Sequence, residues 1–80
     1  MTKLKRLRRK AGLTQRQLGE LAGLSYSYIR AMEAGRYSPS VRSIAAVSRV
    51  LAKKLGQNQR EIICSLAVDA AKGGAKTKNR

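Results

Sequence analysis

Residues 13–35 read LTQRQLGELAGLSYSYIRAMEAG, and they contain the start and stop signals of two short helices. Thr14 followed by Gln17 has the spacing of a capping box, which opens a helix. Gly23 can adopt the left-handed conformation that ends this helix, and Ser25 can cap the start of the next one. The sequence therefore predicts two helices joined by a turn of about four residues.

The apolar residues of these two helices predict how the helices pack. Leu18 and Leu21 share one face of the first helix, and Ile29 and Met32 share one face of the second. We expect the two faces to pack together, with the small Gly19 allowing a close approach of the backbones. This arrangement is a helix-turn-helix motif, and it leaves the N-terminal turn of the second helix exposed.

Similar signals predict three more helices around this motif. One precedes it, one begins after Ser40, and one begins at Asn58 and ends at the glycine pair 73–74. The predicted fold class is thus an all-α compact bundle of about five short helices. We expect residues 1–72 to form a single domain and residues 73–80 to form a flexible basic tail.

The charge of the chain indicates a polyanionic partner. Eighteen Lys and Arg against four Asp and Glu give a formal net charge of +14 on 80 residues, which favours nucleic acid. The sequence has no His and one Cys, so it lacks the residues needed for a typical zinc site, an imidazole general base or a Cys/His dyad. Four scattered acids argue against a paired-carboxylate or magnesium site. We therefore expect no enzyme activity, no metal site and no cofactor.

Two further features concern the location of the protein. Cys64 has no partner for an internal disulfide, which fits a reducing compartment. No stretch approaches the roughly 18 apolar residues of a membrane span, and the basic start is not followed by the apolar region of a signal peptide. The sequence predicts a cytoplasmic protein without a membrane segment.

The motif resembles the helix-turn-helix domains of Cro and the phage repressors, which form the XRE family. Four features occur together: a Gln that opens the first helix of the motif, the small Gly19, the turn at Gly23, and the Glu-x-Gly at residues 33–35. The resemblance extends over residues 4–55. It implies a lambda-repressor-like fold whose third helix enters the major groove of double-stranded DNA.

The resemblance also implies roles for individual residues. Family members place the Gln that opens the first helix of the motif on a DNA phosphate, and this Gln is Gln15 here. Several members tie the helix before the motif to the second helix of the motif through an Arg–Glu pair, which matches Arg8 and Glu33. Tyr26 stands at the first base-contacting position, where many relatives have Gln, so their base preference does not transfer. Ala34 stands where a polar phosphate-binding residue is common.

The residues expected to contact DNA fall into two groups. Those expected at base edges are Tyr26, Ser27, Arg30 and Ala31. Those expected at phosphates are Arg8, Gln15, Arg16, Ser25, Tyr28, Arg36, Tyr37, Ser38 and Ser40. The members of the second group at residues 36–40 are expected to replace the contact that Ala34 cannot make.

The fifth predicted helix carries an apolar stripe with two interpretations. The stripe can pack on the domain's own core, or a second copy of the chain can cover part of it; its residues are Ile62, Ile63, Leu66, Ala67 and Ala70. A C2 homodimer would place two recognition helices about 34 Å apart and would bind a pseudo-palindrome. We favour the homodimer, because the stripe is wide for so small a bundle.

Together these features predict a sequence-specific DNA-binding regulator of transcription. Repression is the simpler mode of action, because occlusion of polymerase needs no further surface. Two alternatives stay open. The first is an antitoxin-like or other protein-interaction module that also binds DNA, for which the cationic surface would favour an acidic protein partner. The second is a sequence-neutral nucleic-acid-binding protein, whose affinity would come from counterion release.

Overall fold

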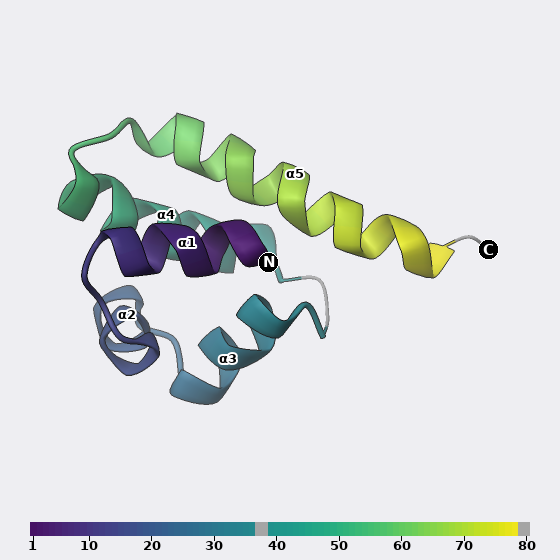
Figure 1. Ribbon diagram of the computed structural model, residues 1–80, viewed down its shortest axis with the longest axis horizontal. Helices are drawn as coiled ribbons and strands as arrows, with labels where there is room; N and C mark the ends of the chain where they lie inside the picture. The colour runs from purple at the N-terminus through teal and green to yellow at the C-terminus, as the bar shows by residue number, and fades with distance from the viewer. Residues whose placement is uncertain (37–38, 79–80) are drawn as a thin grey trace.

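A computed structural model describes residues 1–36 and 39–78, with side chains at residues 1–36 and 39–69. This part of the chain forms five helices and no strand. The helices are α1 (Thr2–Lys10), α2 (Gln15–Ala22), α3 (Tyr26–Ala34), α4 (Val41–Leu55) and α5 (Gln59–Lys78). In Figure 1, α1 and α4 lie between α5 on one side and α2 with α3 on the other. The predicted all-α, lambda-repressor-like bundle is confirmed.

The side chains predicted to cap α2, α3 and α4 do so. Thr14 Oγ1 accepts a hydrogen bond from the Gln17 N–H at 3.0 Å, and Gln17 Oε1 accepts one from the Thr14 N–H at 2.9 Å. Ser25 and Ser40 each accept the N–H three residues further on, both at 3.1 Å. Gly23 follows α2 with a φ of 74°, a conformation that residues with a Cβ rarely adopt. These local signals fix where α2, α3 and α4 begin and where the turn lies.

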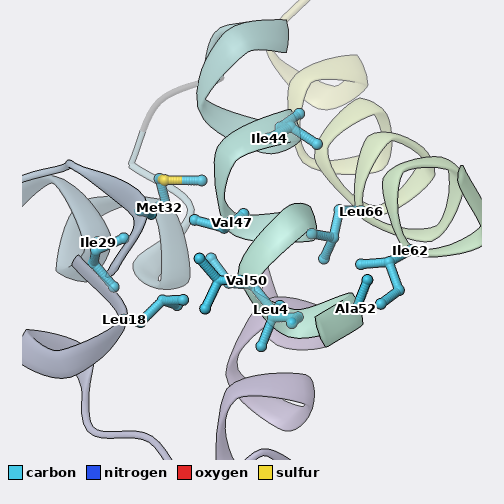
Figure 2. Packing of buried hydrophobic residues seen from close by; sticks show 12 residues of the cluster. Leu4, Leu18, Ile29, Met32, Ile44, Val47, Val50, Ala52, Ile62 and Leu66 are labelled. Carbon is cyan, nitrogen blue, oxygen red and sulfur yellow. The ribbon is translucent and has the colours of Figure 1, made fainter. Parts of the chain in front are cut away.

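Helix α4 supplies the centre of the core. Its Val47 and Leu51 are fully buried. The other four helices surround it, as Figure 2 shows, and contribute Leu4, Leu18, Ile29, Met32, Ile62 and Leu66. Each such buried side chain stabilises the fold by about 1.5–3 kcal/mol. The core therefore holds α2 and α5 against α4, while α3 packs mainly on α2 and α1.

Gly19 lies where α2 approaches the turn before α3 most closely. A Cβ at this position would lie 2.7 Å from the Leu24 carbonyl oxygen and 3.4 Å from the Ile29 side chain. The first of these distances is shorter than van der Waals contact allows, and a backbone oxygen cannot turn aside as a side chain can. The prediction that a small residue permits this approach is confirmed.

Leu21 is the exception to the predicted packing of α2. Half of its surface is exposed (50%), whereas Leu18, one turn earlier, is fully buried. Successive residues of a helix are about 100° apart, so Leu21 lies at the edge of the buried face. Leu21 is therefore not part of the buried core, and Leu18 and Ala22 provide the buried apolar surface of α2.

Helix α5 is longer than predicted. Asn58 Oδ1 accepts the Arg60 N–H at 2.8 Å at its start, as expected for a cap. The helix does not end at the glycine pair 73–74 but continues to Lys78. Each glycine disfavours the helix by about 1 kcal/mol relative to Ala, and the neighbouring Ala and Lys residues favour it. Neither α5 nor any other described helix is long and apolar enough to cross a membrane.

Candidate nucleic-acid interface

The carboxylate of Glu33 joins three helices at one point. Its Oε2 accepts a hydrogen bond from Arg8 Nε at 2.6 Å, and its Oε1 accepts one from Arg8 Nη2 at 3.2 Å. Oε1 also accepts a hydrogen bond from the side-chain amide of Gln15 at 3.0 Å. Arg8 belongs to α1, Gln15 opens α2, and Glu33 lies near the end of α3. This cluster, named here the Glu33 cluster, therefore fixes the orientation of the three helices relative to one another.

The charges of the Glu33 cluster are buried and compensated within it. The side chain of Arg8 is 10% exposed and that of Glu33 is 4% exposed, and they form the one ion pair found among the described residues. Arg8 Nη1 also donates to the Leu13 carbonyl at 2.8 Å. Buried charges persist only when they are paired and hydrogen-bonded. The predicted Arg8–Glu33 pair is present, and its burial leaves little of the Arg8 guanidinium to reach a phosphate.

Gln15, which was expected at a DNA phosphate, also contacts α3 through its side-chain amide. The Nε2 atom braces α3 through Glu33 at 3.0 Å, and the side chain is half-buried at the start of α2. The bond to Glu33 fixes the rotamer of this amide. A fixed amide at the first turn of α2 is well placed to meet a DNA backbone beside α3.

The start of α3 faces away from the core. Ser25 caps it, Tyr26 is 39% exposed, and Ser27 is exposed. The first N–H groups of a helix have no acceptor within the helix, and their partial positive charge attracts anions. The structure thus presents a polar helix end that could enter a groove lined with phosphates.

Tyr26 lies under two arginine side chains. The Cζ atom of Arg16 is 4.8 Å from the centroid of the Tyr26 ring, and that of Arg30 is 5.5 Å from it. Arg16 comes from α2, and Arg30 follows Tyr26 by one turn of α3. All three residues were expected to contact DNA, but their contact with one another was not predicted. The spacing of four residues between Tyr26 and Arg30 was a usable signal, whereas the contact of Arg16 depends on the geometry of the turn.

Tyr28 connects α3 to the start of α4. Its hydroxyl accepts a hydrogen bond from Ser43 Oγ at 2.8 Å, and Ser43 Oγ accepts one from Ser40 Oγ at 3.0 Å. Tyr28 is half-buried. Tyr28 and Ser40 were predicted as phosphate contacts. In the structure both also help to hold α3 against α4.

The remaining predicted DNA contacts differ in exposure. Arg16, Arg30 and Arg36 are exposed, and Ala31 is half-buried on α3. Tyr37 and Ser38 lie outside the described residues. The exposed cations of this set therefore come from α2, from α3 and from the segment that follows α3.

The predicted dimer residues of α5 separate into two groups. Ile62 and Leu66 are 2% and 0% exposed, because they pack into the domain's own core. The interpretation that a second copy covers them is wrong. Ile63 is half-buried and Ala67 is exposed, so these two remain accessible, and the side chain of Ala70 lies outside the described residues.

A shallow groove between α2 and α4 was not anticipated. Its volume is 250 Å³, and its lining residues are Leu21, Arg49, Val50, Lys53 and Lys54. Three of them are cations and none is an acid. The exposed Leu21 therefore lies in a cationic setting, and we call this feature the Leu21 groove.

Comparisons with known proteins agree with this geometry. The helix-turn-helix family model matches residues 4–58. A Methanothermobacter thermautotrophicus protein described as an uncharacterized HTH-type transcriptional regulator is 38% identical over 71 residues, which are 89% of this chain and 97% of that protein. The immunity repressor protein of Bacillus phage phi105 is 43% identical over 49 residues, which are 61% of this chain and 34% of the repressor. No solved structure gives a significant match.

The matched residues include the features on which the candidate interface rests. They contain the Glu33 cluster, the turn at Gly23 and the exposed start of α3. Both relatives are named as regulators or repressors. The chain belongs to the XRE-type helix-turn-helix family of DNA-binding transcriptional regulators.

Proposed function

We propose that this protein is a sequence-specific regulator of transcription that places α3 in the major groove of double-stranded DNA and acts as a repressor. The observation that carries this proposal is the rigid presentation of α3. The Glu33 cluster fixes α1, α2 and α3 together while the start of α3 stays exposed. Side chains can distinguish base edges only when their helix is held at a fixed angle. The net charge of +14 adds attraction to any DNA.

The side chains around the start of α3 divide between the two kinds of DNA contact. Phosphate contacts are assigned to Gln15, Arg16, Ser25, Arg36 and Ser40, and base contacts to Tyr26, Ser27, Arg30 and Ala31. Arg8 supports Gln15 through Glu33. An occupied operator excludes polymerase without any further surface, which supports repression. The cytoplasm is the proposed location, in accord with the single Cys of the chain.

We also propose a C2 homodimer. Its interface would use only the accessible part of the apolar stripe of α5. The accessible candidates are Ile63 and Ala67, together with the neighbouring Cys64 and Val68, of which Val68 is 55% exposed. Two copies joined by this face would present two α3 helices about 34 Å apart. Their target would then be a pseudo-palindrome with half-sites one helical turn apart.

Selection from a randomised duplex library at physiological salt tests the function. An excess of nonspecific DNA suppresses binding that depends on charge alone. Recovery of a palindromic motif supports the dimeric regulator, and recovery of an asymmetric motif supports a monomeric one. Tight binding at low salt without any motif contradicts the proposal and favours sequence-neutral binding.

A pair of variants that each lose one charge separates the proposed site from general attraction. Arg30→Ala removes an exposed cation from α3, and Arg49→Ala removes an exposed cation from α4. We expect Arg30→Ala to lower affinity for the selected operator about 5- to 160-fold, from the usual cost of a lost base contact, about 1–3 kcal/mol. Arg49→Ala should lower it less, by under about threefold. Equal losses in the two variants would contradict the placement of α3 in the groove.

The Leu21 groove favours a second candidate function, the binding of an acidic protein segment. Gln15 and Leu21 lie one turn before and one turn after the buried Leu18, and so on opposite flanks of α2. A groove on the flank away from Gln15 would stay accessible when DNA is bound. Its exposed Leu21 offers nothing to a phosphate, whereas an acidic amphipathic helix could match both this side chain and the cations beside it.

A synthetic helical peptide with Leu residues flanked by Glu tests this second candidate by fluorescence anisotropy. Leu21→Ser should weaken peptide binding, whereas Val41→Ser should not, because the exposed Val41 lies outside the groove. Equal peptide binding by both variants and the unaltered protein would show attraction by charge alone and would contradict the candidate.

A further inference from the structure

The contact of two guanidinium groups with one aromatic ring sets Tyr26 apart from the rest of the surface. The ring belongs to the first residue of α3, and Arg16 and Arg30 lie over it at 4.8 and 5.5 Å. Since both lie this close to one centroid, the two cations are within about 10 Å of each other, the Debye length in 0.1 M salt. Their mutual repulsion is therefore only partly screened.

No carboxylate of the described residues neutralises either of these cations. Within the described residues the only ion pair is the buried one of the Glu33 cluster, so Arg16 and Arg30 have no carboxylate at ion-pair distance. Attraction of each guanidinium to the ring is weak at an exposed site, and it engages the face of the guanidinium plane and not its N–H groups. The ring therefore orders the two groups while leaving their N–H donors available to an electron-rich ligand.

The places of the two arginines suggest different ligands for them. The recognition helix of a helix-turn-helix lies in the major groove, whereas the helix before it crosses the DNA backbone. Arg30, on α3, would then face base edges, and Arg16, on α2, would face a phosphate. In the major groove an arginine fork matches the O6 and N7 acceptors of guanine, and an apolar ring edge matches the methyl group of thymine.

We propose that Tyr26 and Arg30 together recognise a thymine–guanine step, in which Arg30 donates to guanine O6 and N7 while the Tyr26 ring edge contacts the thymine 5-methyl group. This inference rests on the proposed function and adds the base preference that relatives with Gln at this position do not supply. Arg16 holds the Tyr26 ring against the backbone side of the groove and binds a phosphate. The tyrosine hydroxyl has no part in the recognition.

Single-atom changes in the selected operator test the inference. Each guanine is replaced in turn by 7-deazaguanine, which lacks the N7 acceptor, and each thymine by uracil, which lacks the methyl group. We expect one guanine per half-site whose replacement lowers affinity about tenfold, within the range for a lost bidentate contact. Replacement of the adjacent thymine by uracil should lower affinity about fourfold, which corresponds to the loss of one buried methyl group.

Variants of the two residues assign these effects to side chains. Tyr26→Phe keeps the ring and should keep both effects, whereas Tyr26→Ser should abolish the uracil effect and reduce the deazaguanine effect. Arg30→Ala removes the donors and should abolish the dependence on the N7 atom, whereas Arg30→Lys keeps the charge but loses the fork and should only reduce it. Far-ultraviolet circular dichroism and thermal melting check that each variant is folded.

The failure of the inference differs from the failure of the proposed function. If an operator is selected and no guanine in it is sensitive to the deaza replacement, recognition of guanine by Arg30 is wrong and sequence-specific binding stands. If Tyr26→Ser retains the full uracil effect, the contact of the ring with the methyl group is wrong. If no operator is selected at all, both the function and the inference are overturned.

Discussion

Helices α3 and α5 are held by very different means. The nine residues of α3 are capped by Ser25 at one end and by Gly35 at the other, and Glu33 ties the helix to α1 and α2. The 20 residues of α5 are anchored in the core by Ile62 and Leu66 in its first half. Figure 1 shows its second half running past the other helices.

This difference matches what each helix has to do. A helix that distinguishes bases must keep its orientation, and α3 achieves this with polar contacts that define both position and angle. Helix α5 depends mainly on apolar packing, with two longer, exposed hydrogen bonds, from the Lys3 N–H to Asp69 Oδ2 at 3.3 Å and from Gln59 Nε2 to the Ala45 carbonyl at 3.5 Å. Four sets of substitutions test how the helices are held, from the largest expected effect to the smallest.

Glu33→Ala should destabilise the fold most. It leaves the buried Arg8 without its carboxylate, and an uncompensated buried charge costs about 3–5 kcal/mol. For a domain of this size that is a large part of the total free energy of unfolding. Urea denaturation measures the loss, and Glu20→Ala, which removes an exposed carboxylate from α2, serves as the control and should leave the stability unchanged.

A double variant sharpens this first prediction. Arg8→Met combined with Glu33→Leu replaces the pair by apolar groups and should recover most of the stability lost in Glu33→Ala. Gln15 would still lose its hydrogen bond to Glu33, so the double variant should bind DNA more weakly than the unaltered protein. Full affinity in the stable double variant would contradict the role of the Glu33 cluster in orienting α3.

Gly19→Val should have the next largest effect. The new Cβ would lie 2.7 Å from the Leu24 carbonyl oxygen, so the turn between α2 and α3 would have to shift. Overpacking of this kind costs about 1–3 kcal/mol. Thermal melting measures the loss, and Gly19→Ala, with a smaller side chain, should lose less. Equal stability of the Val variant and the unaltered protein would contradict the close approach.

Two serines of α4 should respond to Ala in opposite directions. Ser48 is fully buried, and among the described residues its hydroxyl has no hydrogen-bond partner. Ser48→Ala should therefore raise the free energy of unfolding by about 1 kcal/mol. Ser43 is almost as buried but donates to the Tyr28 hydroxyl, so Ser43→Ala should lower it by about 1 kcal/mol. Changes of the same sign would contradict this assignment.

The sequence predicted the helix starts well and the exposure of single residues less well. Capping at Thr14, Ser25 and Ser40 depends on residues within one turn, so the local pattern was sufficient. The exposure of Leu21 depends on where α4 lies against the edge of α2, which no local pattern contains. Periodicity identifies the apolar face of a helix, but it does not show how far the neighbouring helix covers that face.

For the candidate site too, some features could be predicted from the sequence and others depend on tertiary packing. The Arg8–Glu33 pair joins residues 25 positions apart, and it was predicted only through the family resemblance. The contact of Arg16 with Tyr26 crosses the turn between two helices, and its geometry depends on the close approach at Gly19. Local chemistry thus predicted which residues belong to the site, and tertiary packing decided which of them touch.

The glycine pair 73–74 provides the smallest and most discriminating test. Because α5 is helical through these residues, replacing both glycines by Ala should favour the local helix by about 0.5–1 kcal/mol for each. Amide hydrogen exchange at residues 70–78 should then slow, while the midpoint of urea denaturation barely moves, because Leu66 is the last described core residue. Unchanged exchange in this segment would instead favour the flexible basic tail that the sequence predicted. The test therefore separates a helix that extends beyond its core from one that ends with it.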